Sequence, residues 1–238
     1  MIEAPTEITR GYHLNVAWFS NETLDFFGEL ELNNDRDWFA KHKKHYEKFV
    51  KEPMELFAAE MIERMKQINP EISMQPKDAV FRIYRDTRFS KDKTPYKTNA
   101  GISIARGGKT HASTGVYFHL DAHKMGIASG RYFLEPPQLA AIRSHIAKNL
   151  DEFEKLLADK DFKERFGTVA GEKNKILPAD LREAAAKQPL LFNKQFYYWA
   201  EHDGANALRD DLADFVMLHV RAAVPMNTFL SEACETEA

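Results

Sequence analysis

Residues 101–129 read GISIARGGKTHASTGVYFHLDAHKMGIAS, and this stretch indicates the type of fold. Apolar side chains alternate with polar or small ones over residues 101–105, 114–120 and 125–129, which is the period of a strand with one buried face. The pair of glycines at 107–108 separates the first two runs, and a glycine pair in that position is typical of a hairpin. The stretch therefore predicts an antiparallel meander.

Two further segments are predicted to extend the meander. Residues 80–84 form a β-rich run before it, and residues 195–199, Gln-Phe-Tyr-Tyr-Trp, form another after it. We therefore expect an antiparallel sheet of about four to five strands, in which the segment 82–97 connects the first two. The aromatic residues of the last run are expected in the core, with Tyr198 or Trp199 as candidates for the wall of a pocket.

Helical spacing of apolar residues appears on both sides of this region. Before it, the pattern covers residues 21–69, with a kink or restart expected at Pro53 because proline lacks the backbone donor. After it, the pattern covers residues 136–166, and a last helix is expected to end before Pro225. Helices that flank the strands on both sides in sequence predict the α+β class, with an antiparallel sheet between N-terminal and C-terminal helices.

The chain of 238 residues shows no repeat and no low-complexity segment. We expect one α+β domain over residues 16–230, with a flexible arm at 1–15 and a polar tail at 231–238. Hydrophobic residues make up 44% and charged residues 29% of the chain, as in soluble globular proteins. A net charge of -3 argues against a general DNA-coating protein and against a protein held on membranes by charge.

The single cysteine, Cys234, excludes an internal disulfide and fits a reducing cytoplasm. One cysteine cannot build a thiolate cluster, and the apolar residues suffice for a core at this length, so we expect no structural zinc. No cofactor is expected either. The N-terminus lacks the basic and apolar regions of a secretory signal, and no apolar run approaches the roughly 20 residues of a membrane-spanning helix. We therefore expect a soluble, cytoplasmic protein without a membrane partner.

The densest charge in the chain lies in residues 82–97, RIYRDTRFSKDKTPYK. This segment holds six basic side chains against two acidic ones, a local excess of four positive charges. Arginine offers a rigid fork of donors and lysine a compact point charge, and both suit phosphate and carboxylate groups. We interpret the segment as an anion site whose candidate ligand-binding residues are Arg82, Arg85, Arg88, Lys91, Lys93 and Lys97.

The alternative interpretation of the segment is a loop held by ion pairs with carboxylates elsewhere in the protein. Asp86 and Asp92 can offset only two of the six cations, which favours the anion site. Phe81, Ile83 and Phe89 are expected to be mostly buried, because aromatic and aliphatic residues between the charges suggest a packed loop. At least three of the six cations are expected to reach solvent or a shared cleft.

Three motifs resemble one family of microbial and fungal proteins. They are NNDRDWF at 33–39, the basic string at 82–97 and EPPQLAAIR at 135–143. Together they resemble the family catalogued as domain of unknown function 2461, and the resemblance extends over residues 16–230. It implies a single domain of one type, and it brings no established reaction, cofactor or catalytic residue.

Other patterns are weaker candidates. Gly108-Lys109-Thr110 resembles the end of a phosphate-binding loop, but the earlier glycine of that motif is missing and the context predicts a hairpin turn. His119, Asp121 and His123 alternate and would share one face of a strand, so a metal site is an alternative to a polar turn. His219 lies on an apolar helical stripe and is expected to be a buried, hydrogen-bonded histidine.

The leading hypothesis is a protein that binds a phosphate-bearing or polycarboxylate small molecule through the segment 82–97. The hypothesis leaves open whether the protein is an enzyme. In an enzyme, Asp86 or Asp92 would act as general base or as a carboxylate that holds a metal ion, and His119 is a further candidate for a catalytic residue. One alternative is a nucleic-acid-binding module, which a sequence pI near 6.3 disfavours. The other is a non-catalytic protein-interaction domain that docks an acidic partner.

Overall fold

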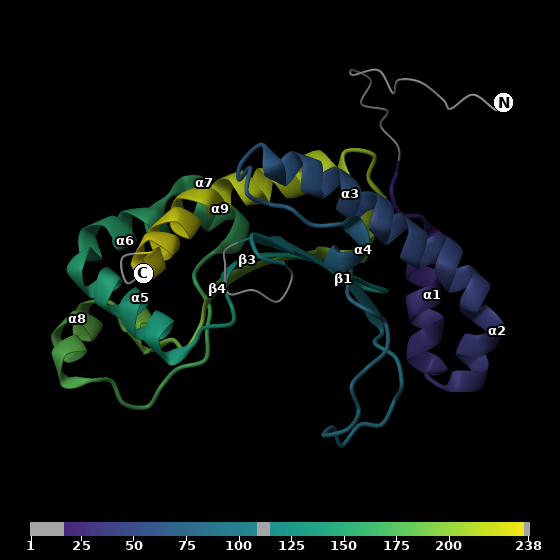
Figure 1. The fold of residues 1–238 in the computed structure, drawn as a ribbon, viewed down its shortest axis with the longest axis horizontal. Coiled ribbons are helices and arrows are strands. Elements are labelled where there is room, and N and C mark those ends of the chain that lie inside the picture. The colour runs from purple at the N-terminus through teal and green to yellow at the C-terminus, as the bar shows by residue number, and fades with distance from the viewer. Residues whose placement is uncertain (1–16, 109–114, 236–238) are drawn as a thin grey trace.

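The computed structural model describes residues 17–108 and 115–235, and its fold has the predicted α+β class. The arm expected at 1–15 lies outside these residues. The N-terminal part is helical (Figure 1). It consists of α1 (Asn21–Leu32), α2 (Arg36–Tyr46), the π-helical turn η1 (Glu47–Lys51), α3 (Glu52–Lys66) and the one-turn α4 (Pro76–Ala79).

The joints between these helices follow from the sequence. The Asp35 carboxylate accepts hydrogen bonds from the backbone N–H groups of Asp37 and Trp38 at 2.9 and 2.8 Å, and so caps the start of α2. Pro53 lies in the first turn of α3, directly after the π-helical turn. The chain does not restart there: it stays helical from Arg36 to Lys66, and the π-helical turn just before Pro53 is the local irregularity.

Four strands form one antiparallel sheet in chain order, as the alternating pattern predicts. They are β1 (Asn99–Ala105), β2 (Gly115–Asp121), β3 (Lys124–Arg131) and β4 (Phe196–Asp203). The turn after β1 begins with Gly107 and Gly108 at φ of 80° and 101°, which glycine adopts readily. After β2, the Asp121 carboxylate accepts the backbone N–H groups of His123 and Lys124 at 2.8 and 2.7 Å and closes the next turn.

The run at 80–84 is not a strand, so this part of the prediction is wrong. Val80 makes one isolated bridge to Ile102 of β1, and the chain then turns away from the sheet edge (Figure 1). The charged side chains of residues 82–88 follow directly, and a paired strand would bury some of these charges against the core. The segment 82–97 therefore precedes β1 and does not connect two strands.

The C-terminal part is helical apart from β4. Its helical elements are α5 (Pro136–Lys148), α6 (Leu150–Ala158), α7 (Lys160–Phe166), η2 (Ala179–Leu181), α8 (Arg182–Lys187), η3 (Pro189–Phe192), η4 (Gly204–Leu208) and α9 (Leu212–Glu235). The predicted end before Pro225 is wrong, because α9 continues to Glu235. Beyond the proline, Met226, Phe229 and Leu230 are buried in the core, and their burial offsets the lost hydrogen bond.

Helices cover one face of the sheet. Figure 1 shows α3 and α9 along that face, while no helix of residues 17–108 and 115–235 covers the opposite face, which we call the open face, between the segment 82–97 and the helices α5 and α8. Along β2, Val116, Phe118 and Leu120 are buried under the helices, and the residues between them are half-buried on the open face. The core therefore lies between sheet and helices, and a ligand can reach the sheet from the other side.

Two histidines meet inside this core. His219 of α9, which is 2% exposed, lies with Nδ1 at 2.9 Å from the Phe215 carbonyl oxygen and with Nε2 at 3.3 Å from Nε2 of His202 on β4. The carbonyl requires a proton on Nδ1 of His219, so Nε2 of that ring accepts the N–H of His202. Burial, together with the nearby His202 and arginine charges, lowers the pKa of His219 to about 4. The predicted buried, hydrogen-bonded histidine is confirmed.

This pair predicts a loss of stability in acid. Between pH 6.5, the ordinary pKa, and about 4, the unfolded chain binds a proton that folded His219 does not, so the free energy of unfolding falls as the pH falls. The pKa difference corresponds to a loss of about 3 kcal/mol. Urea unfolding at several pH values across this range measures the loss. His219→Gln has no titratable group at this position, so it should flatten the plot of the free energy of unfolding against pH. The exposed His123→Gln is the matched control, and an equally flat profile in the parent protein would contradict the prediction.

Candidate functional site

The open face of the sheet combines aromatic side chains with positions that carry no side chain. On β2 and β4 it presents Tyr117, His119 and Trp199, each half-buried. On β1 and β3 it presents Gly101 and Gly126, which stand directly opposite His119 in the register of the two neighbouring strands. Aromatic rings therefore have room to lie across the sheet.

Two of these rings lie over glycines of the neighbouring strand. A Cβ atom at Gly101 would come within 2.7 Å of the Tyr117 hydroxyl and within 3.1 Å of two carbons of its ring. A Cβ atom at Gly126 would overlap the six-membered ring of Trp199. Each ring thus covers the backbone of a glycine, and a larger residue at either position would displace it.

A pocket of about 450 Å³ opens on this face. On its β1 side stands Phe81, whose ring centroid lies 6.0 Å from that of Tyr117 at an interplanar angle of 69°. Toward β4 stand Tyr132 and Phe133, which are 57% and 60% exposed. The Tyr132 ring meets that of Tyr197 at 5.2 Å and 63°. The pocket therefore has aromatic side chains both on its floor and on two sides.

Sequence reasoning found part of this pocket. Trp199 lines it, as one of the two candidates proposed for a pocket wall, whereas Tyr198 is fully buried on the helix side of the same strand. Tyr132 and Phe133 were missed, because they follow β3 in an irregular stretch without a periodic pattern. The signal that identifies the floor is the alternation within residues 197–199, which places neighbouring aromatic residues on opposite faces.

The basic segment 82–97 forms an arm that projects from the edge of the sheet beside this pocket (Figure 1). Backbone hydrogen bonds join its two ends: Lys97 donates to the Ile83 carbonyl at 2.8 Å, and Arg85 donates to the Pro95 carbonyl at 2.9 Å. Lys97 also places its ammonium group 5.3 Å from the centroid of the Phe81 ring. The base of the arm thus lies at the rim of the pocket.

Ion pairs within the arm use both of its acids. Arg85 binds Asp92, and Arg88 binds Asp86 at 2.6 Å. Hydrogen bonds from Arg88 and Arg85 lower the pKa of Asp86 and Asp92, respectively, to about 2. A carboxyl with so low a pKa is a weak proton acceptor at neutral pH, so these two residues fit the role of ion-pair partner better than that of general base.

The arm is less packed than its aromatic residues suggest. Ile83 is 4% exposed, as predicted, and Phe81 is half-buried, but Phe89 is 94% exposed, so the expected burial of Phe89 is wrong. It lies beyond the bridge between Tyr84 and Tyr96, where the arm no longer follows the sheet. The expected exposure of the cations is confirmed, since four of them are exposed: Arg82, Arg88, Lys91 and Lys93.

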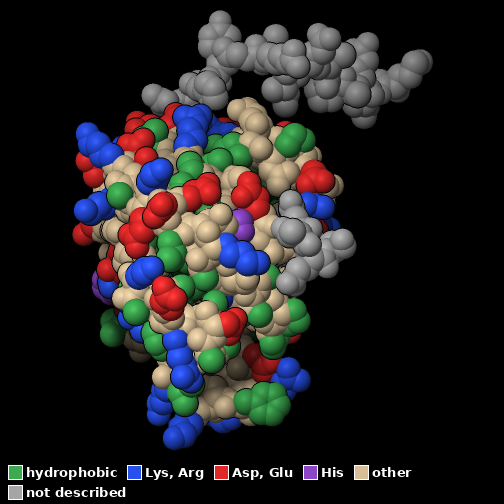
Figure 2. Space-filling model, turned by 90° about the vertical axis from the view of Figure 1, so that its left-hand side faces the viewer, with side chains coloured by type: hydrophobic (Ala, Val, Ile, Leu, Met, Phe, Trp, Pro, Cys, Tyr) green, Lys and Arg blue, Asp and Glu red, His purple; other side chains and the backbone are tan. Residues whose placement is uncertain are grey.

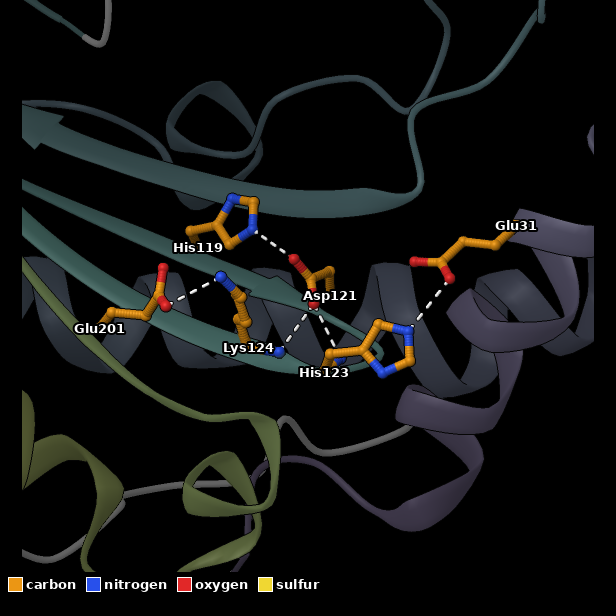
Figure 3. A network of polar contacts seen from close by, with 6 residues as sticks. All are labelled: Glu31, His119, Asp121, His123, Lys124 and Glu201. Atoms are coloured by element: carbon orange, nitrogen blue, oxygen red, sulfur yellow. Dashed lines mark hydrogen bonds and ion pairs between the residues drawn. The ribbon is translucent and has the colours of Figure 1, made fainter.

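His119 and Asp121 form a dyad on the open face (Figure 3). His119 Nε2 lies 2.9 Å from Asp121 Oδ2. Burial raises the pKa of Asp121, but hydrogen bonds from His119 and two backbone N–H groups outweigh it and leave the pKa below its ordinary value. The carboxylate accepts the Nε2–H of neutral His119, so Nδ1 of that ring is a hydrogen-bond acceptor. Within residues 17–108 and 115–235, no residue donates a hydrogen bond to this Nδ1.

His123 does not join this dyad, so the three alternating residues do not share one face. The strand ends at Asp121, and His123 Nε2 lies 3.2 Å from Glu31 Oε2 on α1 (Figure 3). In the described part of the chain, no group of three or more His, Cys, Asp or Glu residues is placed to hold a metal ion. Residues 109–110 of the candidate phosphate loop lie outside the described residues, and β1 and β2 pair around them as a hairpin.

The seating of Trp199 over Gly126 predicts a cost for any side chain there. Gly126→Ala forces the ring off the sheet, so it should destabilise the protein by about 1 to 3 kcal/mol and shift tryptophan fluorescence to the red. The matched control is Gly28→Ala in α1, whose new Cβ would lie 3.8 Å from that of Ala122. It should be neutral or stabilising, because alanine favours helix. Equal melting temperatures for the two variants would contradict this packing.

Within the described residues, no helix has both the length and the apolar character needed to cross a membrane. No curated protein matches the sequence. A family model described as conserved hypothetical protein (DUF2461) matches residues 22–229, which include the capped α2, the basic arm, the whole sheet and most of α9. The match covers most of the chain and agrees with the resemblance of its three motifs. The chain belongs to the DUF2461 family.

Proposed function

We propose that the protein binds a phosphate-bearing or polycarboxylate small molecule on the open face of the sheet. The body of the ligand occupies the pocket, and its acidic group lies at the base of the basic arm. One observation carries the proposal: the Lys97 ammonium group lies above the ring of Phe81, and Phe81 lines the pocket. A cation is therefore held at the rim of an aromatic cavity of about 450 Å³, a volume within the range of small-molecule sites.

The charge of the arm supports the same ligand class. Six cations and two acids leave an excess of four positive charges, and both acids are already engaged in ion pairs inside the arm. Arg82, Lys91 and Lys93 are exposed along it. Such an excess beside a cavity raises the local concentration of anions and steers them toward its rim.

A nucleic-acid interface is the weaker candidate. The chain carries a net charge of -3, and Figure 2 shows Lys and Arg interspersed with Asp and Glu over the side of the molecule that faces the viewer. Binding along a nucleic-acid backbone requires a continuous basic surface and loses affinity steeply with added salt. A small-ligand pocket predicts a modest salt dependence and selectivity among anions.

Thermal unfolding with pyrophosphate and with citrate tests the proposal. A ligand that binds the native state raises Tm, so at least one of these anions should raise the Tm of the parent protein. Lys97→Ala should lose most of that shift, because it removes the cation at the rim. The matched control is Lys48→Ala, which removes another lysine that lies over a phenylalanine ring, 4.7 Å from the centroid of Phe49. An unchanged Tm of the parent with every anion, or equal shifts in both variants, would overturn the proposal.

Arg88 provides a second test, because its partner Asp86 is exposed and not buried. Arg88→Ala should therefore leave the Tm of the free protein unchanged, since an exposed pair contributes little to folding. It should reduce the Tm shift given by an anion less than Lys97→Ala does, because Arg88 lies out along the arm beyond the Tyr84 bridge. A marked fall in the Tm of free Arg88→Ala would show that the arm is held by this pair for structural reasons.

A further inference from the structure

We infer that the ligand of this pocket carries a planar aromatic ring beside its acidic group, as a nucleotide does, and that the ring stacks on Tyr117 and Trp199. The inference rests on the proposed function, because it names the ligand class of the same pocket. It depends on how the two rings are seated, on the walls beside them and on a hydrogen-bond acceptor next to them.

The glycines determine which face of each ring is available. Tyr117 covers Gly101 and Trp199 covers Gly126, so one face of each ring lies on the backbone of the neighbouring strand. Both residues line the pocket and are half-buried, so the other face of each ring is turned toward the cavity. Aromatic faces seated on a sheet are surfaces on which nucleic-acid bases stack, and we call the rings of Tyr117 and Trp199 the platform.

The walls limit what can lie on this platform. Phe81 is inclined by 69° to Tyr117, and Tyr132 is inclined by 63° to Tyr197, so both wall rings stand steeply to the aromatic rings beside them. Between the walls the sheet offers small residues, including Ser103. The planes of Tyr117 and Trp199 are tilted by 36° to each other, so a flat ring lies parallel to one of them and meets the other ring and the walls at an angle, as tilted and edge-to-face aromatic contacts do.

His119 adds a polar group beside the platform. Its ring lies 5.8 Å from that of Trp199, and its Nδ1 is an acceptor because Asp121 holds the proton on Nε2. Nucleobases carry N–H donors at their edges, and ribose 5-phosphate has none. Together with Lys97 at the rim, the pocket therefore offers a stacking floor, an acceptor and a cation, which match the base and the phosphate of a nucleotide.

Calorimetric titration of the full chain with three kinds of probe tests the inference. The probes are the monophosphates of adenosine, guanosine and uridine, ribose 5-phosphate, which lacks the ring, and adenosine, which lacks the phosphate. The tightest monophosphate should bind about tenfold or more tightly than ribose 5-phosphate, because stacking of one base contributes that much. Adenosine should bind more weakly than its monophosphate, because it lacks the phosphate that would contact the Lys97 ammonium group.

Substitutions of the platform rings test whether stacking causes the difference in affinity between the monophosphate and ribose 5-phosphate. Trp199→Leu should bring the affinities for the monophosphate and for ribose 5-phosphate together, whereas Trp199→Phe, which keeps a ring, should preserve most of the difference. Tyr117→Leu removes the other platform ring and repeats the test if Trp199→Leu does not fold. His119→Leu should weaken the binding of the monophosphate and leave the affinity for ribose 5-phosphate unchanged.

The outcomes separate this inference from the proposed function. If ribose 5-phosphate binds as tightly as every monophosphate and Lys97→Ala abolishes both, the anion site stands and the stacking inference is wrong. If neither a phosphate compound nor citrate binds, both are wrong, and if only citrate binds, the inference alone is wrong. A ten-nucleotide single strand that binds more than about 100-fold tighter than any monophosphate, with a steep loss of affinity in salt, would also overturn the inference in favour of a nucleic-acid interface.

Discussion

Val116, Phe118 and Leu120 of β2 pack under the helices, and this one-sided burial determines where the neighbouring side chains lie. Because successive residues of a strand point to opposite faces, each residue fixed in the core fixes the next one on the open side. Tyr117 and His119 reach the open face for this reason. The pocket is thus a direct consequence of a sheet that α3 and α9 cover on one face only.

The open face also shows how a sheet can present aromatic rings without exposing a large apolar surface. Rings that stood upright would expose both faces to water, whereas Tyr117 and Trp199 each cover the backbone of a neighbouring strand. This arrangement requires glycine at 101 and 126, where a strand is otherwise weakened by a missing side chain. The two glycines therefore give up local strand stability, and in return they let both rings lie against the sheet.

The basic arm and the buried histidine pair show opposite uses of titratable groups. In the arm, the acids pair with neighbouring arginines in contact with water, so these pairs contribute little to holding the fold together. Buried His219 shares one hydrogen bond with half-buried His202, and burial disfavours an added proton on His219. Charge in the arm thus contributes little to folding stability, while the histidine pair ties folding stability to pH.

The sequence by itself determined the α+β class and the meander, because both rest on local periodicity. Local patterns failed where tertiary contacts compete with them: burial carries α9 through Pro225, and Phe89 stays in solvent although it is aromatic. The basic arm was visible as a run of charge, but its place beside an aromatic pocket was not. Phe81, Trp199 and Tyr132 come together only when strand pairing joins distant parts of the chain, and that pairing is decided by the packed core.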